Sequence, residues 1–208
     1  MSILDKLFGT PIQRQAKQII RNARVNTVRK RTPLNKIGMA VIHGANTCYQ
    51  SIKPMIIAGD EERTTYAEFS VLSEFVFFFL HMVNRAAHPL FTAAQFEKLH
   101  AYCGEMVIPV VIDSFMGHWP EEMKAKIRGE FFENLNKAEI EYSKATALFS
   151  KDQPFLGDSL LSMLARAIAK RCGQPTNPEV MMSVMDSAMN AITDAKFEEL
   201  ISDAARVL

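Results

Sequence analysis

An apolar run broken only by one histidine restricts the fold more than any other feature of this chain. The run covers residues 75–83, reads Phe-Val-Phe-Phe-Phe-Leu-His-Met-Val, and directly follows Glu74. A helix that is apolar on every side has no face to offer water, so other elements normally surround it. We therefore predict a central helix over about residues 66–87, with Glu74 and His81 in or near the protein interior.

Helix start and stop signals divide the rest of the chain. Thr65 with Glu68, and Thr92 with Gln95, match the capping-box pattern and are predicted to open two helices. Pro109 should kink the second of these. Further helices are expected to begin at Thr32-Pro33, at Pro120, near Asp158 and at Asn177-Pro178.

The chain offers no alternating β-branched segments, so we predict an all-α bundle of six to seven helices. Residues 32–208 are expected to form a single helical domain, and residues 1–31 a basic amphipathic N-terminal arm. Small residues in the helix after Thr32 predict a close helix crossing at which His43 is satisfied. These small residues are Gly38, Ala40, Gly44 and Ala45.

Four ionisable residues are candidates for burial: Glu74, His81, Arg85 and Asp113. Glu74 and His81 share one helical stripe but lie about 10 Å apart along the axis. Because buried polar groups are mostly structural, we predict a polar seam. In it Glu74 pairs with a basic or hydroxyl group, and His81 is hydrogen-bonded across a helix interface. A ligand-binding or catalytic role is the alternative, and Asp113 either meets water or joins this pair.

A metal site is a second alternative, with Glu97, His100, Glu74 and His81 as its candidate ligands. Glu97 and His100 form a Glu-x-x-His pair, which di-iron bundles use twice but which occurs only once here. No cofactor is predicted. The chain has no phosphate-binding glycine loop, nucleophile elbow or zinc motif, so no catalytic residue is assigned.

The basic arm carries most of the charge asymmetry. Residues 1–36 have a net charge of +8, whereas the rest of the chain carries −7. Ile12, Ala16, Ile19 and Ala23 form an apolar strip at helical spacing. The candidate partner- or anion-binding residues are Arg14, Lys17, Arg21, Arg24, Arg29, Lys30 and Arg31.

The arm has three candidate partners. Such a segment can bind an anionic membrane surface or a nucleic-acid backbone. We favour packing against the acidic body of its own chain or of a second subunit.

These patterns indicate a non-enzymatic module that binds a protein partner, a second copy of itself or a small apolar ligand. The alternative is a metal- or cofactor-dependent enzyme with a buried Glu/His/Asp site. Three widely spaced cysteines and the charged residues Asp5 and Lys6 predict a cytoplasmic protein without a signal peptide. The longest apolar run is too short for a membrane span, so no transmembrane helix is expected.

Overall fold

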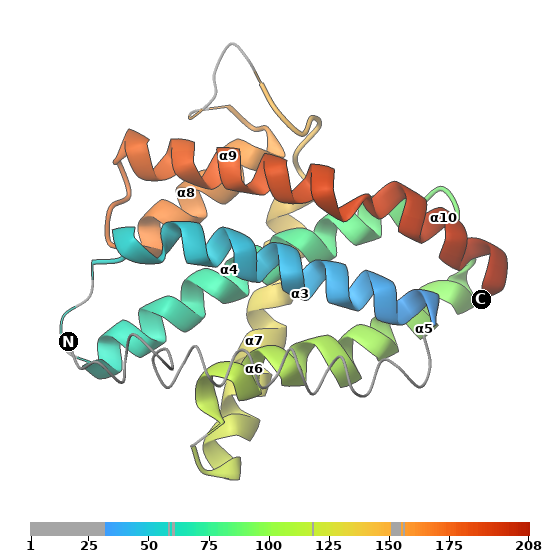
Figure 1. Cartoon of the computed structure of the whole chain (residues 1–208), viewed down its shortest axis with the longest axis horizontal. Coiled ribbons are helices and arrows are strands. Elements are labelled where there is room, and N and C mark those ends of the chain that lie inside the picture. The colour runs from blue at the N-terminus through green and yellow to red at the C-terminus, as the bar shows by residue number, and fades with distance from the viewer. Residues whose placement is uncertain (1–31, 58, 60, 118, 151–154, 156) are drawn as a thin grey trace, which may run out of the picture.

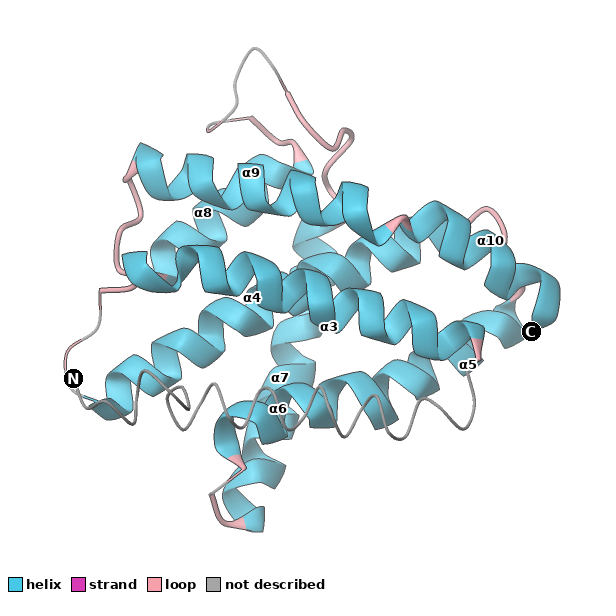
Figure 2. Cartoon of the chain, viewed as in Figure 1, coloured by secondary structure: helices cyan, strands magenta, loops and turns pink. Residues whose placement is uncertain are grey.

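A computed structural model describes residues 32–57, 59, 61–117, 119–150, 155 and 157–208. The predicted basic arm, residues 1–31, lies outside these ranges. Within them the chain is helical, without a strand (Figures 1 and 2). The elements are α3 (Pro33–Ile52), η1 (Lys53–Met55), α4 (Glu61–Ala87), α5 (Ala93–Tyr102), η2 (Cys103–Val107), α6 (Ile108–Met116), α7 (Glu121–Tyr142), α8 (Leu160–Arg171), α9 (Pro178–Ala195) and α10 (Phe197–Val207).

The bundle of six to seven helices is confirmed. Helices α5, η2 and α6 follow one another without a gap and form one rod (Ala93–Met116), called here the α5–α6 rod. Helices α9 and α10 are separated only by Lys196, whose left-handed φ of 49° breaks the single last helix that the sequence predicted. With these two pairs each counted once, the described residues form six helical rods.

The central helix is also confirmed. In α4, Phe75, Phe78 and Phe79 are completely buried, and Phe77 is nearly so. Helices α3, α7, α8 and α10 all pack against α4, so it is covered on several sides at once. The phenylalanine run therefore forms the core of the bundle, as a helix without a polar face must.

Of the two predicted capping boxes, one is wrong and one is confirmed. Helix α4 begins at Glu61, before Thr65, so Glu68 lies inside the helix. Its buried carboxylate instead accepts hydrogen bonds from the Tyr49 hydroxyl at 2.6 Å and the Lys53 ammonium at 2.9 Å. At α5, both reciprocal hydrogen bonds of the Thr92–Gln95 box are present.

A π-helical turn lies directly before Pro109 in the α5–α6 rod, and the kink at Pro109 stays a prediction. The turn that precedes it, η2, is a π-helix in which the Ile108 N–H bonds to the Cys103 carbonyl. Proline has no N–H, and its ring clashes with the carbonyl four residues earlier, here that of Glu105. The wider π turn accommodates this proline while the helix continues into α6.

Two stretches are long and apolar enough to cross a membrane, judged by length and composition alone. They are Arg63–Ala87, in α4, and Ala93–Met116, the α5–α6 rod. The length of the longest uninterrupted apolar run predicted neither stretch, because polar residues interrupt both. The core helix of a soluble protein meets the same criteria, and 78% of the relevant α4 window is buried by the protein itself, against 39% for the rod.

Candidate functional site

Glu74 lies in a buried cluster with every carboxylate oxygen occupied. The Tyr142 hydroxyl donates to Oε1 at 2.5 Å, and the Arg171 Nε donates to Oε2 at 2.8 Å. Arg171 also donates to the Ser70 hydroxyl at 2.5 Å. Burial and the adjacent Glu74 carboxylate hold the pKa of Tyr142 well above its ordinary value. The predicted pairing of Glu74 with a basic and a hydroxyl group is confirmed, and this Glu74 cluster ties α4 to α7 and α8.

His81 is buried as predicted, but its expected hydrogen bond is absent. Nδ1 lies 3.0 Å from Glu139 Oε2 on α7, within ion-pair distance. Neither ring nitrogen makes a hydrogen bond within the part of the chain described. Burial acts to raise the pKa of Glu139, but His81, Asn84 and His100 together outweigh it and lower that pKa.

Arg85, predicted as a candidate for burial, is exposed instead, and Asp113 follows the water-exposed alternative of its two predictions. Arg85 lies at the last turn of α4, where its guanidinium reaches out to the Ala145 carbonyl at 3.3 Å. Asp113 lies on the outer side of α6, where water solvates the carboxylate without a buried partner. Neither residue joins Glu74 and His81 in a single buried group.

The four metal candidates do not converge. Glu97 is exposed on α5, and Glu74 is engaged with Arg171 and Tyr142. His100 Nε2 instead lies 3.2 Å from the Asn84 amide oxygen. Among the residues that the structure describes, no three His, Cys, Asp or Glu side chains are placed to hold a metal ion.

A pocket of about 560 Å³ adjoins His81 and is lined by His88, His100, Asn84 and Glu139 among others. His81 itself also lines this pocket, but its two ring nitrogens are buried. The free cysteines Cys48, Cys103 and Cys172 are buried too, and burial raises their thiol pKa values to about 12, 12 and 11. Such thiols are unreactive at neutral pH.

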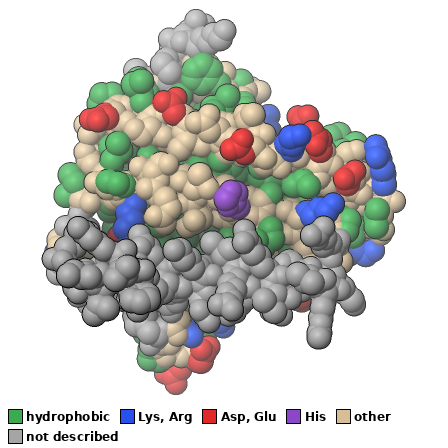
Figure 3. Space-filling view, viewed as in Figure 1, with side chains coloured by type: hydrophobic (Ala, Val, Ile, Leu, Met, Phe, Trp, Pro, Cys, Tyr) green, Lys and Arg blue, Asp and Glu red, His purple; other side chains and the backbone are tan. Residues whose placement is uncertain are grey.

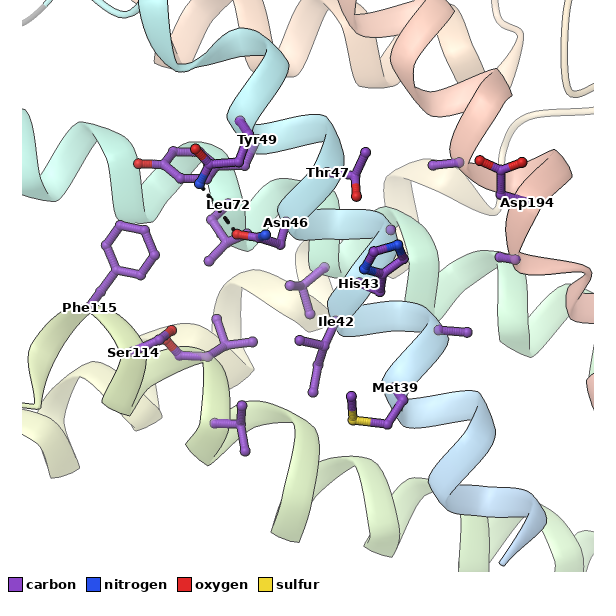
Figure 4. A pocket seen from close by; sticks show the side chains of 18 residues that line it. Met39, Ile42, His43, Asn46, Thr47, Tyr49, Leu72, Ser114, Phe115 and Asp194 are labelled. Carbon is purple, nitrogen blue, oxygen red and sulfur yellow. Dashed lines mark hydrogen bonds between the residues drawn. The ribbon is translucent and has the colours of Figure 1, made fainter. Parts of the chain in front are cut away.

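The outer face of α3 carries a second cavity, of about 500 Å³, called here the α3 groove. Helix α3 runs along it between Met39 and Gln50, with α6 on one side and the end of α9 on the other, and Leu72 and Val76 of α4 also line it. In Figure 4, Ser114 and Phe115 of α6 lie across from Ile42, Asn46 and Tyr49. Asp194 of α9 lies on the opposite side of α3, beyond His43 and Thr47.

Glycine residues and the π turn give the α3 groove its shape. A Cβ on Gly44 would lie 3.2 Å from the Phe79 ring, so glycine lets α3 sit directly on the core helix. A Cβ on Gly38 would lie only 2.7 Å from the Tyr102 ring, so α3 also crosses the α5–α6 rod closely. Beyond that crossing, the π turn η2 leads into α6, which brings Val110 and Phe115 to the wall.

The lining is apolar with one acidic group. Asp194 is the charged side chain that lines the groove. No Lys or Arg among the described residues lines it. Asn46, Thr47, Gln50 and Ser114 supply uncharged hydrogen-bonding groups. Figure 3 shows this face of the molecule, on which the described Lys, Arg, Asp and Glu side chains are scattered between apolar and uncharged ones. Apolar clefts with a few polar groups are the usual form of a ligand site.

Comparison of the chain with protein-family models, with curated proteins and with solved structures gave no significant match. The site must therefore be interpreted from its own geometry.

Sequence reasoning missed the α3 groove, because its walls come from distant parts of the chain. The small residues of α3 were the available signal, and the close crossing that they predicted is confirmed. The prediction for His43 is wrong: its side chain is exposed and lines the groove.

Proposed function

We propose that this protein is a non-enzymatic binding module whose α3 groove receives the apolar side of a basic amphipathic helix. The observation that carries this proposal is the groove itself, an apolar cavity of about 500 Å³ that is half open to solvent. Helix-in-groove recognition uses such a surface, into which anchors at i, i+3, i+4 and i+7 of a helical partner insert.

The dimensions of the groove favour a helix over a small molecule. Residues 39–50 of α3 extend about 16 Å at 1.5 Å rise per residue, which equals three turns of a partner helix. A small ligand is normally enclosed over most of its surface. The α3 groove runs along a helix and stays open on one side, as a bound helix requires.

The charge of the site favours a basic partner. Asp194 lines one side of the groove, and the exposed Asp113 precedes Ser114 on the other side. Opposite charges at the rim of an interface mainly increase the association rate and the specificity. An acidic partner helix would meet the Asp194 carboxylate and be disfavoured.

The proposal also covers the cellular compartment of the protein and the partners of its basic arm. Three free, buried cysteines are compatible with a reducing compartment, and we propose the cytoplasm. Binding of the basic arm to a membrane surface or to nucleic acid stays a prediction, because residues 1–31 lie outside the described residues.

The proposal is tested with a fluorescent amphipathic peptide of leucine and lysine, about 18 residues long because shorter helices are marginal in water. Ala40→Phe places a ring in the groove, because Ala40 is a partly exposed lining residue. Ala125→Phe makes the same change at an exposed position of α7 that does not line the groove. We expect fluorescence polarisation to show about tenfold weaker binding for Ala40→Phe, or about 1.4 kcal/mol, and unchanged binding for Ala125→Phe. Equal affinities for the two variants would refute the proposal.

A further inference from the structure

We propose that the resident occupant of the α3 groove is the N-terminal segment of the same chain, with residues 12–23 in the groove as a helix that an external helix must displace. The inference rests on the proposed function of the groove and names its occupant and its regulation. Residues 1–31 lie outside the described residues, so the argument uses their sequence and the geometry of what they would contact.

The apolar strip of the segment matches the length of the groove. Ile12, Ala16, Ile19 and Ala23 recur at steps of four, three and four, which aligns them on one side of a helix. From the first to the last of them a helix rises about 16 Å, the same length as residues 39–50 of α3. Two isoleucines separated by alanines suit a shallow groove in which a helix lies close to its floor.

The tether brings the strip to the groove. The segment joins the described chain at Thr32, whose hydroxyl caps α3 by accepting a hydrogen bond from the Asn35 N–H at 3.3 Å. The groove begins at Met39, about 10 Å along α3 from that point. Residues 24–31 can extend to about 26 Å, which is ample to turn back along α3. A short tether also gives the strip an effective concentration in the millimolar range.

The charges are complementary as well. Arg14, Lys17, Arg21 and Arg24 accompany the strip, and residues 1–36 carry a net charge of +8 against −7 on the remainder. The groove is lined by the carboxylate of Asp194 and by no Lys or Arg among the described residues. The segment thus has the two properties proposed for a partner, an apolar strip and a basic flank, in the same chain as the groove.

The test uses the full chain and the leucine–lysine peptide. Ile12→Asp with Ile19→Asp puts two carboxylates in the strip. Gln13→Asp with Gln18→Asp makes the same charge change off the strip, so it serves as the matched control. We expect the strip variant to bind the peptide about tenfold more tightly, because its own segment no longer competes, and the control to bind like the unmodified chain.

Four kinds of outcome, the last with two cases, distinguish this inference from its rivals and from the proposed function. Tighter binding by the strip variant alone, at constant molecular mass in light scattering, supports docking within one chain. A dimeric unmodified chain that becomes monomeric in the strip variant would assign the groove to the segment of a second copy. Unchanged peptide affinity with lost sedimentation on anionic vesicles would make the segment a membrane anchor. Either of the last two results overturns the inference.

The fourth outcome concerns the groove alone. If Ala40→Phe weakens peptide binding but the strip variant and its control bind equally, the proposed function stands and the inference about the occupant fails. If Ala40→Phe also has no effect in the strip-variant background, the groove does not bind helices and both fail.

Discussion

Among the described residues, the two helical stretches that are long and apolar enough to cross a membrane differ in how far the rest of the chain covers them. Helix α4 is surrounded by α3, α7, α8 and α10, and 78% of its most apolar window is buried. In the α5–α6 rod, of nearly equal length and hydropathy, only 39% is buried. Part of what remains open is the wall of the α3 groove, with Val110 and Phe115. Composition thus determines how much apolar surface a helix carries, and packing determines whether that surface holds the fold together or remains available to a partner.

The largest expected effect is from removing one phenylalanine in each region. Phe79 is completely buried and meets the Phe78 ring edge-on at 5.2 Å between centroids. Phe79→Ala should lower the free energy of unfolding by about 4 kcal/mol. Phe115→Ala, at the groove wall, should cost about half of that because its site already meets solvent. Urea denaturation measures both, and equal losses would show that the rod is as well enclosed as α4.

The second prediction concerns the polar cluster of α4. Arg171→Met leaves the Glu74 carboxylate buried without its cation and should cost about 3 kcal/mol. In the double variant Glu74→Gln with Arg171→Met, the neutral amide still accepts from Tyr142, so the loss should be smaller than the sum of the two single losses. Additive losses in a double-mutant cycle would mean that the two side chains do not interact.

Alanine substitutions at two glycines compare the effect of an added Cβ at a tight helix crossing with its effect on an open helix surface. Gly38→Ala would place a Cβ 2.7 Å from the Tyr102 ring and should destabilise the protein by about 1–3 kcal/mol. Gly129→Ala, on α7 with nothing within 4 Å of the added Cβ, should stabilise it by about 0.5–1 kcal/mol. Thermal unfolding of the two variants should shift in opposite directions. A stabilising Gly38→Ala would contradict the close approach of α3 to the rod.

The smallest effect is a loss of stability at alkaline pH. Burial is the main cause that raises the pKa of Tyr102 to about 12, and burial with a carboxylate neighbour raises those of Tyr49 and Tyr142 further. The unfolded tyrosines ionise near pH 10, so the unfolded state loses its protons first. Stability should begin to fall near pH 9, where the unfolded thiols ionise while the buried ones stay protonated, and should fall more steeply above about pH 10, where the tyrosines add to the loss. Tyr142→Phe should make that fall shallower, and a rise in stability above pH 10 would contradict the sign.

The sequence predicted the features that depend on local patterns. The apolar run identified the core helix, Thr92 with Gln95 identified a helix start, and the small residues of α3 indicated a close crossing. Each of these signals lies within one helix. The false capping box at Thr65 shows the limit of local patterns, because Glu68 is used by Tyr49 and Lys53 from the preceding helix and turn.

Features that depend on several helices could not be predicted in this way. Burial of Glu74 followed from its neighbours in sequence, but its partners Tyr142 and Arg171 lie 68 and 97 residues away. Asp113 follows an apolar triplet, yet the side of α6 on which it lies faces solvent. The residues that line the α3 groove are spread along the chain from Met39 to Ala195, so no periodicity within one segment could predict it.

The most direct test of the account is to map peptide binding on the protein by NMR. Backbone amide shifts of the full-length strip variant, Ile12→Asp with Ile19→Asp, are followed as the leucine–lysine peptide is added. We predict that the perturbed amides lie along residues 39–50 of α3, residues 110–115 of α6 and residues 191–195 of α9, with little change around His81 and His100. Perturbations centred on the pocket beside His81, or none at saturating peptide, would contradict the claim that the α3 groove is the binding site.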